Sequence, residues 1–312
     1  MSHSLRFSLI VPTRQRTEKL RRFLDSLAAT TADIRRIEVV LVIDADDSDS
    51  RSFHFDRDFL RKVIVDPGLP MGALNQAGYE ACSGDFIMLM NDDVIVKTRK
   101  WDRRVSSCLR RYPDGIVLIH VNDTLFQEGM CTFPLVSRTY CELAGGICPT
   151  DYLRYRIDDH VEQVFNLLGV LGERRIAYLP DVIFEHDKFI ETRAGERKYY
   201  LDERLELLDE PRFAGYFEAR KELALRLRRH ITGRRDQPVD EECRSSLKSI
   251  ENSQALRPVG RYRHESPTRR LLSGARRRLS ELFQAREECR RRQPSPEHLT
   301  PGYAPARIKP LS

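Results

Sequence analysis

The chain has 312 residues, of which 40% are hydrophobic and 32% are charged. This length fits one large domain with an appendage, or two domains, and the composition is of the soluble globular type. The longest uninterrupted apolar runs, such as residues 86–90, fall far short of the ~20 residues that span a bilayer. The N-terminus lacks the apolar core of a signal peptide, and the seven cysteines form no CxxC pair, so we expect reduced thiols in a cytoplasmic protein.

The net charge of +6 is distributed unevenly. Residues 256–312 hold 14 Lys and Arg against 5 Asp and Glu, a net charge of +9. The remaining residues therefore carry a net charge of −3, and the basic character belongs to the C-terminal tail.

Apolar runs and amphipathic segments alternate over the first hundred residues. A strand is predicted over residues 6–11, and Thr17 is expected to cap a helix with apolar residues spaced i, i+3, i+4, i+7. The next predicted elements are strands at 37–43, 62–65 and 86–90 and a helix at 71–82. This alternation is typical of βαβ units and predicts a parallel sheet with helices on both faces.

The alternation is looser in the second half of the chain. A helix is expected to begin at the acid pair Asp158-Asp159, and two strands are expected to end at Pro180 and at His186. The other predicted elements are a helix at 99–111 with the single tryptophan, strands at 115–121 and 131–137, a short helix stopped by Gly145-Gly146, and charged helices after residue 195.

Acidic side chains follow two of the predicted strands directly. Asp44 and Asp46 follow strand 37–43, and Asn91-Asp92-Asp93 follow strand 86–90. Because right-handed crossovers bring the carboxyl ends of parallel strands to one edge, these acids are expected to share a cleft that suits Mg²⁺ or Mn²⁺. The first strand is not followed by GxGxxG, and no GxxxxGK[ST] occurs, which disfavours a dinucleotide fold and a P-loop.

Six segments, in order and with matching spacing over about residues 5–190, resemble the family 2 glycosyltransferases. They are SLIVPTRQR, VVLVIDADDSDS, LNQAGYEACSGDFIMLMNDDV, PLVSRTYCELAGG, DDHVEQVFNLLGVLG and RIAYLPDVIFEH. The resemblance implies the α/β GT-A fold, a Rossmann-like, mostly parallel sheet flanked by helices, here with an α-helical C-terminal extension.

The expected domain organisation combines this resemblance with the composition of the C-terminal part. It comprises a GT-A glycosyltransferase domain at 1–195, a helical extension at 196–233, a linker at 234–267, a basic amphipathic helix at 268–292 and a disordered tail at 293–312.

The resemblance also implies a metal site for Mn²⁺ or Mg²⁺. Asp93 matches the family's direct metal ligand, and His186 matches a late histidine that completes the metal shell. Asp92 or Asn91 would then face the ribose or a metal-bound water. Asn91 departs from the family pattern, which often has Asp there. For His186, the alternative is an ordinary histidine at a strand end.

By the same resemblance, the acid pair Asp158-Asp159 carries the catalytic base. Asp159 is the expected base, which takes the proton of the acceptor hydroxyl, and Asp158 is the neighbour that positions the acceptor or the base. The family usually has Glu then Asp. The alternative is that the two acids only stabilise the N-terminus of their helix.

The nucleotide would be bound by residues near the first two strands. Asp44, or alternatively Asp46, is expected to receive the base or the ribose. The other expected contacts are Pro12, Thr13 and Arg16 in the pocket wall and Asn75 in the preceding helix. Leu74 stands where the family has a basic residue, so Arg14, Arg16 or Lys188 would have to supply the missing cation for the diphosphate.

The tail segment 268–292 has an apolar stripe flanked by nine arginines. One interpretation is a helix lying on an anionic membrane surface, near lipid-linked acceptors. The other is a helix that packs on its own domain or on a partner protein. Nucleic-acid binding is the weakest alternative, because no recognition motif accompanies the charge.

The function predicted from these patterns is metal-dependent, inverting transfer of a sugar from a nucleotide-diphosphate sugar to the hydroxyl of a glycan, lipid-linked or small-molecule acceptor. The expected location is the cytoplasm, at the inner face of the membrane if the tail binds lipid. The alternatives are a nucleotidyltransferase on a similar architecture and a non-catalytic scaffold that binds through its basic tail.

Overall fold

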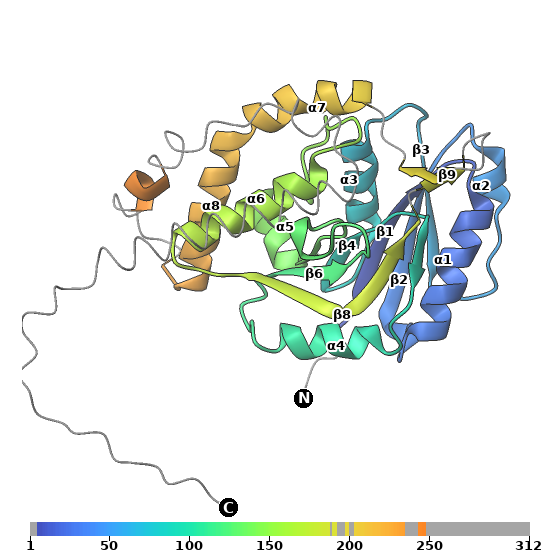
Figure 1. Cartoon of the computed structure of the whole chain (residues 1–312), viewed down its shortest axis with the longest axis horizontal. Coiled ribbons are helices and arrows are strands. Elements are labelled where there is room, and N and C mark those ends of the chain that lie inside the picture. The colour runs from blue at the N-terminus through green and yellow to red at the C-terminus, as the bar shows by residue number, and fades with distance from the viewer. Residues whose placement is uncertain (1–4, 188, 192–196, 200–202, 235–242, 248–312) are drawn as a thin grey trace, which may run out of the picture. The chain divides into compact units, whose positions relative to one another are not determined.

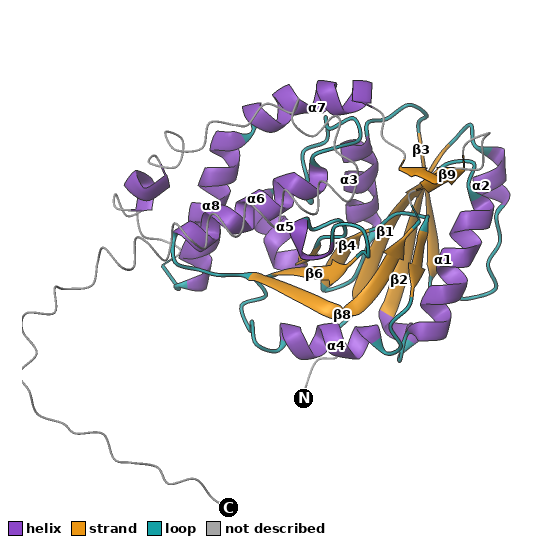
Figure 2. Cartoon of the chain, in the orientation of Figure 1, coloured by secondary structure: helices purple, strands orange, loops and turns teal. Residues whose placement is uncertain are grey.

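The computed structural model describes residues 5–187, 189–191, 197–199, 203–234 and 243–247. Strands of a single large sheet lie between helices in this part of the chain (Figures 1 and 2). The order of its strands is β3-β2-β1-β4-β7-β6-β8-β5. Their bounds are β1 Phe7–Thr13, β2 Ile37–Asp44, β3 Leu60–Val65, β4 Phe86–Leu89, β5 Val94–Val96, β6 Leu118–Asn122, β7 Leu135–Ser137 and β8 Ile176–His186.

The first four strands form the parallel part of the sheet. β1 lies between β2 and β4, and β3 extends the sheet beyond β2. The apolar runs of β1, β2 and β4 are buried almost throughout, as expected for parallel strands that helices cover on both faces. This geometry brings the carboxyl ends of β1, β2 and β4 to one edge, as the sequence predicts.

The second half of the sheet is mixed. β7 is antiparallel to β4 and β6, β5 is antiparallel to β8, and β6 is parallel to β8. The two strands predicted to end at Pro180 and His186 are one strand, β8, so that prediction is wrong. The register of β8 against β6 shifts next to Asn122, and this irregularity accommodates Pro180, which has no N–H to donate.

Helices cover both faces of the sheet and create two apolar clusters. On one face, Leu20, Phe23 and Leu24 of α1 pack with Trp101 of α4. On the other face lie residues of α5, α6 and α8. The helices are α1 Thr17–Thr30, α2 Ser48–Ser52, α3 Met71–Ala81, α4 Trp101–Leu109, α5 Arg138–Ala144, α6 Ile157–Val170, α7 Glu203–Gly215 and α8 Phe217–Ile231, with 3-10 turns at Ile34–Arg36 and Gln127–Gly129.

The start of α1 differs from the prediction. The helix begins at Thr17, but its N-cap position is Arg16, and no side chain caps it. Arg16 is thereby left at the turn after β1, where its guanidinium points to the ends of other strands. The observed α/β architecture, with a mostly parallel sheet flanked by helices, confirms the predicted fold class.

The C-terminal helices α7 and α8 are packed against the rest of the described chain. Leu223, Ala224 and Leu227 of α8 belong to the same apolar cluster as α6. The prediction of helices with mainly surface charge is wrong for Arg220, which is fully buried. The domain boundary predicted at residue 195 stays a prediction.

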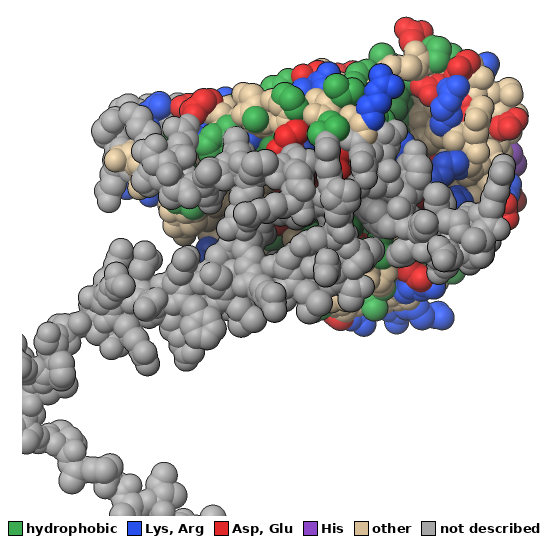
Figure 3. Space-filling model, turned by 45° about the horizontal axis from the view of Figure 1, so that its top comes forward, with side chains coloured by type: hydrophobic (Ala, Val, Ile, Leu, Met, Phe, Trp, Pro, Cys, Tyr) green, Lys and Arg blue, Asp and Glu red, His purple; other side chains and the backbone are tan. Residues whose placement is uncertain are grey.

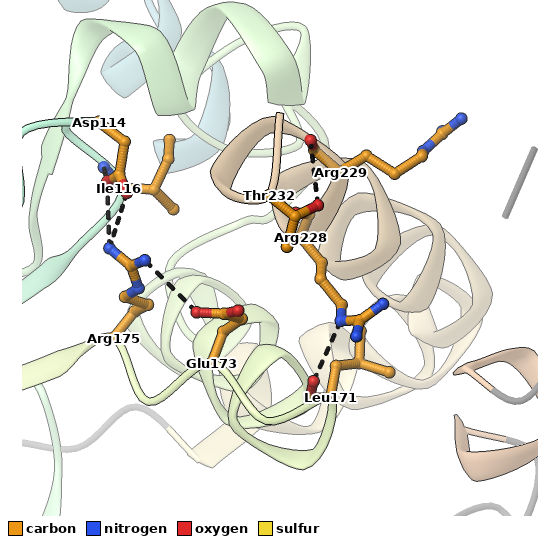
Figure 4. A network of polar contacts seen from close by, with 8 residues as sticks. All are labelled: Asp114, Ile116, Leu171, Glu173, Arg175, Arg228, Arg229 and Thr232. Atoms are coloured by element: carbon orange, nitrogen blue, oxygen red, sulfur yellow. Dashed lines mark hydrogen bonds and ion pairs between the residues drawn. The ribbon is translucent and has the colours of Figure 1, made fainter. Parts of the chain in front are cut away.

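A group of polar contacts joins the chain after α6 to α8 and to the loop before β6 (Figure 4). Arg175 binds Asp114 through Nη1 at 2.9 and 3.1 Å. Nε of Arg228 donates to the carbonyl oxygen of Leu171 at 3.1 Å. These contacts fix the end of α6 that lies away from Asp158.

A small hairpin of β9 Phe189–Glu191 and β10 Arg197–Tyr199 follows β8. On the face shown in Figure 3, acidic and basic side chains are mixed with hydrophobic ones. Six cysteines of the described part are free and buried. None of the helices described here combines the length and the apolar character that crossing a membrane needs.

Three of the predicted C-terminal segments are not covered by the described residues. They are the basic helix at 268–292, the tail at 293–312 and most of the linker at 234–267.

Candidate active site

A cavity of about 430 Å³ opens at the carboxyl ends of β1 and β4. Eight of the residues predicted to act at the site line it: Pro12, Arg16, Asn75, Asn91, Asp92, Asp93, Asp158 and His186. They come from the end of β1 and the turn after it, from α3, from the end of β4, from the start of α6 and from the end of β8. The sheet thus brings together side chains that are far apart in the sequence.

Asp92 is buried at the centre of this wall. Its carboxylate accepts a hydrogen bond from Oγ1 of Thr13 at 2.7 Å and lies 2.8 Å from Nη1 of Arg16. Burial raises the pKa of Asp92 to about 6, although Arg16 and Thr13 act in the opposite direction. Thr13 does not line the cavity, and its hydroxyl fixes the orientation of the Asp92 carboxylate.

Asp93, the neighbouring acid, has the opposite pKa shift. Burial acts to raise its pKa, but the contacts and charges of His186 and Arg16 outweigh this effect and lower it. Nη2 of Arg16 lies 2.5 Å from Oδ2 of Asp93. One guanidinium therefore binds both adjacent acids, which explains how two like charges are tolerated at the mouth of a buried strand.

Three polar atoms converge beside Arg16 in a way that fits a divalent cation. Nε2 of His186 lies 3.3 Å from Oδ1 of Asp93 and 3.1 Å from the side-chain amide of Asn91. Oδ1 of Asp93 is buried and makes no hydrogen bond to a described residue. The amide of Asn91 can present its oxygen when it is turned over.

Among the described residues, no group of three or more His, Cys, Asp and Glu side chains gathers around one point. If a cation bound here, Asp93 and His186 would be two ligands, and the Asn91 oxygen would be a third after the amide is turned over. A hard cation that keeps open positions for phosphate oxygens and water needs no more protein ligands than this.

The acids at the end of β2 and in the turn after it do not line the cavity. Asp44 and Asp46 both bind Arg14, with Nη1 at 2.8 Å from Asp44 and at 2.5 Å from Asp46, and none of the three lines the cavity. The structure therefore does not bring Asp44 or Asp46 to the wall formed by Asp93 and His186. Arg14 is also not the missing cation of the cavity, whereas Arg16 and Lys19 line it; Lys188 lies outside the described residues.

At the start of α6, Asp158 lines the cavity and Asp159 does not. Asp159 accepts a hydrogen bond from Nη1 of Arg156 at 2.9 Å. Oδ1 of Asp158 accepts the backbone N–H of Asp159 at 3.0 Å. The geometry thus favours Asp158 over Asp159 as the residue that meets a ligand.

Several residues that line the cavity have no counterpart in the sequence prediction. They are Lys19, Met71, Met130, Thr132, Arg154, Tyr155 and Ile157. Lys19 lies one helical turn after Arg16, and this spacing could have indicated it. Most of the others lie on loops with no pattern of their own.

One of these loops is organised by Asp123, which is fully buried. Its Oδ1 accepts the backbone N–H groups of Leu125, Phe126 and Gln127 at 2.8 to 3.0 Å. Its Oδ2 accepts the hydroxyl of Thr132 at 2.6 Å. A single carboxylate thus shapes the segment that presents Met130 and Thr132 to the cavity.

Comparison with solved structures finds similar chains at low identity. TarS from S. aureus shares 15% identity over 73% of this chain and 44% of that chain, with a TM-score of 0.49. TarS 1-349 in complex with UDP-GlcNAc shares 15% identity over 86% of this chain and 79% of that one, with a TM-score of 0.48. A mannosyltransferase, PcManGT from Pyrobaculum calidifontis in complex with GDP-Man and Mn2+, shares 15% identity over 88% of this chain and 74% of that one, with a TM-score of 0.47. The chain spans less than half the length of the first of these, and values this low carry no argument about function.

No curated protein matches the sequence. The family model described as Glycosyl transferase family 2 matches residues 8–124. The matched range includes β1, β2, β4 and the acids Asp92 and Asp93. The predicted resemblance to the family 2 glycosyltransferases, and with it the predicted enzyme class, is therefore confirmed by a match that covers residues 8–124.

Proposed function

We propose that the protein transfers a sugar from a nucleotide-diphosphate sugar to an acceptor hydroxyl, with a divalent cation and with inversion at the anomeric carbon. The observation that carries the proposal is the convergence of Asp93, His186, Arg16 and Asp158 on one cavity within and next to a family 2 domain. We call the wall formed by Arg16, the end of β4 and His186 the donor side. The wall formed by loop 151–156 and the start of α6 is the acceptor side.

The donor side supplies positive charge for a diphosphate. Arg16 and Lys19 line the cavity together with Asn75, whose side chain is buried on α3. A guanidinium and an ammonium stabilise a leaving diphosphate by direct charge interaction. Two of the three similar structures are complexes with GDP-Man or UDP-GlcNAc, and these two compounds serve as the first donors to test.

Asp93, His186 and Asn91 would hold the metal ion. When bound, Mn²⁺ or Mg²⁺ would neutralise the negative charge that develops on the departing diphosphate. Arg16 binds Oδ2 of Asp93, so Oδ1, which makes no hydrogen bond to a described residue, would be the atom that meets the cation.

Asp158 is proposed as the catalytic base. Its carboxylate takes the proton of the acceptor hydroxyl while the acceptor oxygen forms its bond to the anomeric carbon. The bond from that carbon to the phosphate oxygen breaks, and the nucleoside diphosphate leaves with the electron pair. A single displacement of this kind inverts the anomeric configuration. Asp159, bound to Arg156, supports the start of α6.

A binding experiment tests the proposal first. Thermal unfolding is followed with UDP, GDP and dTDP, each with and without Mn²⁺, because a ligand that binds only the folded state raises the midpoint. At least one nucleotide is expected to raise it, and more strongly with Mn²⁺. Release of nucleotide from the matching sugar donor is then measured. A chain that shows neither binding nor release with any of the three nucleotides would contradict the proposal.

A further inference from the structure

The loop of residues 151–156 presents Arg154 and Tyr155 to the cavity and leads directly into Asp158. The loop has no helix or strand hydrogen bonds of its own to fix these residues. Its backbone N–H groups must therefore find acceptors elsewhere in the molecule. The group that accepts these hydrogen bonds therefore fixes the position of the loop and of this wall of the cavity.

The acceptors come from Asp209 on α7. This side chain is fully buried, and each of three backbone N–H groups donates to it at 2.8 Å. Leu153 donates to Oδ1, and Arg154 and Tyr155 donate to Oδ2. Hydrogen bonds to an ionised acceptor are about twice as strong as neutral ones. One carboxylate thus holds three consecutive residues of the loop.

The other side of the loop rests on the first turn of α3. The carbonyl oxygens of Tyr152 and Leu153 accept the N–H groups of Gly72 and Met71 at 2.9 and 3.1 Å. The approach is so close that a Cβ at Gly72 would lie 2.2 Å from the carbonyl oxygen of Pro149. The loop is therefore held between α3, which carries Asn75 on the donor side, and α7.

Two more acids of α7 reach the residue that precedes α6. Arg156 has a left-handed conformation with φ of 69°. Its guanidinium lies 3.0 Å from Glu210 and 3.7 Å from Glu206, and it also binds Asp159. The conformation of the chain at the start of α6 is thus fixed from α7 as well.

We propose that α7 positions the acceptor side of the cavity and that Asp209 is a positioning residue for Arg154, Tyr155 and Asp158. This inference rests on the proposed function for its catalytic meaning. α7 lies far outside the range 8–124 that the family model matches, so neither the match nor the sequence pattern points to it. Asp209 does not line the cavity, so it acts through the loop.

Hydrogen exchange of the full chain tests the placement without any ligand. In Asp209→Asn, the amides of residues 153–155 should exchange about tenfold faster or more, because they lose a charged acceptor. The amides of β1 and β2 should be unchanged. The matched control is Glu218→Gln, an exposed acid on α8 that binds Lys221, and it should exchange like the wild type. Unchanged exchange at 153–155 in Asp209→Asn would overturn the proposal.

Steady-state kinetics test the role with GDP-mannose and UDP-GlcNAc, each with Mn²⁺. In Asp209→Asn, the donor KM should stay within about twofold while kcat falls about tenfold to a hundredfold, because only the acceptor side moves. Asp209→Glu, which keeps the carboxylate, should recover part of kcat. A wild-type kcat in Asp209→Asn would overturn the proposal, and so would a general loss of protection that reaches β1 and β2. If the wild type turns over neither donor, the proposed function fails for these donors, and the exchange result still decides the placement.

Discussion

The donor and acceptor sides of the cavity are built in different ways. On the donor side, Asp92, Asp93 and His186 follow strand ends, so the hydrogen bonds of the sheet place them. On the acceptor side, Arg154 and Tyr155 lie on a loop whose backbone amides are bound by the buried carboxylate of Asp209. The loop that carries Thr132 is held in a similar way by Asp123. The comparison shows that a sheet places the backbone of its site residues through its own hydrogen bonds, whereas a loop needs a side chain from elsewhere to bind its backbone amides.

The largest effect is expected at Asp158, the proposed catalytic base on the acceptor side. Asp158→Asn should lower kcat by roughly 10² to 10⁴ while nucleotide binding stays unchanged, because only the base is lost. Asp159→Asn should have a smaller effect, since Asp159 binds Arg156 and does not line the cavity. Nucleotide release under saturating donor measures both. The reverse ranking would restore Asp159 as the base, in agreement with the prediction from the sequence.

On the donor side, Asp93→Asn should lower turnover by roughly 10² to 10³. It should also weaken Mn²⁺ binding, measured by the paramagnetic signal of free Mn²⁺, because Asp93 is the proposed direct ligand. Asp46→Asn is the control, since Asp46 binds Arg14 away from the cavity. Equal Mn²⁺ affinity in Asp93→Asn and the wild type would remove Asp93 from the metal site.

The loop at Asp123 allows a test of stability. Asp123→Asn keeps the shape but removes the charge that three backbone amides share with the Thr132 hydroxyl. We expect the free energy of unfolding to fall by about 2 to 3 kcal/mol, measured by urea denaturation. Turnover should also fall, because Met130 and Thr132 line the cavity. A loss of stability with full activity would show that the loop does not contribute to the site.

The smallest expected effect concerns His160 of α6, which contacts Arg220 of α8. Nδ1 of His160 lies 3.0 Å from the hydroxyl of Tyr152 and 3.3 Å from Nη1 of Arg220. Burial lowers the pKa of His160 to about 3, and the charge of Arg220 acts in the same direction. The folded pKa lies below the unfolded value of about 6.5, so the unfolded state binds more protons between these two values. Stability is therefore expected to fall as the pH drops below about 6.5, by at most about 1.4 kcal/mol per pH unit.

His160→Asn should flatten this dependence, because asparagine does not titrate. The measurement is the urea midpoint between pH 7.5 and pH 5. Identical slopes in the variant and the wild type would mean that His160 does not control the pH dependence.

The donor side could be predicted because its residues follow apolar runs directly. Asp93 stands three residues after the end of a buried run, and the parallel pairing of β1 and β4 then fixes its place. The same reasoning placed Asp44 and Asp46 at this edge, but their carboxylates bind Arg14 and do not line the cavity. An ion pair formed by the side chains of two different turns leaves no periodic signal in the sequence.

The acceptor side could be predicted only as far as α6. Its apolar spacing indicated a helix starting at the acid pair, but the choice between Asp158 and Asp159 depends on Arg156, whose left-handed conformation no residue pattern indicated. Asp209 and Arg220 were expected to belong to charged surface helices. Both are buried against the 151–156 loop and α6. This burial could not be predicted from the local sequence, because these partners lie more than fifty residues earlier in the chain.

His186 is the last residue of β8, so the length of this strand determines where its imidazole points. His186 reaches Asp93 at the end of a strand that is paired with β6 at Leu179 and again at Ile183, with the irregularity between them. Because neighbouring side chains of a strand point to opposite faces, deleting one residue after Ile183 would turn the imidazole away from the cavity. Insertions and deletions should therefore be tolerated only within the irregular stretch between Leu179 and Ile183, where an extra residue can be absorbed without changing the direction of the histidine.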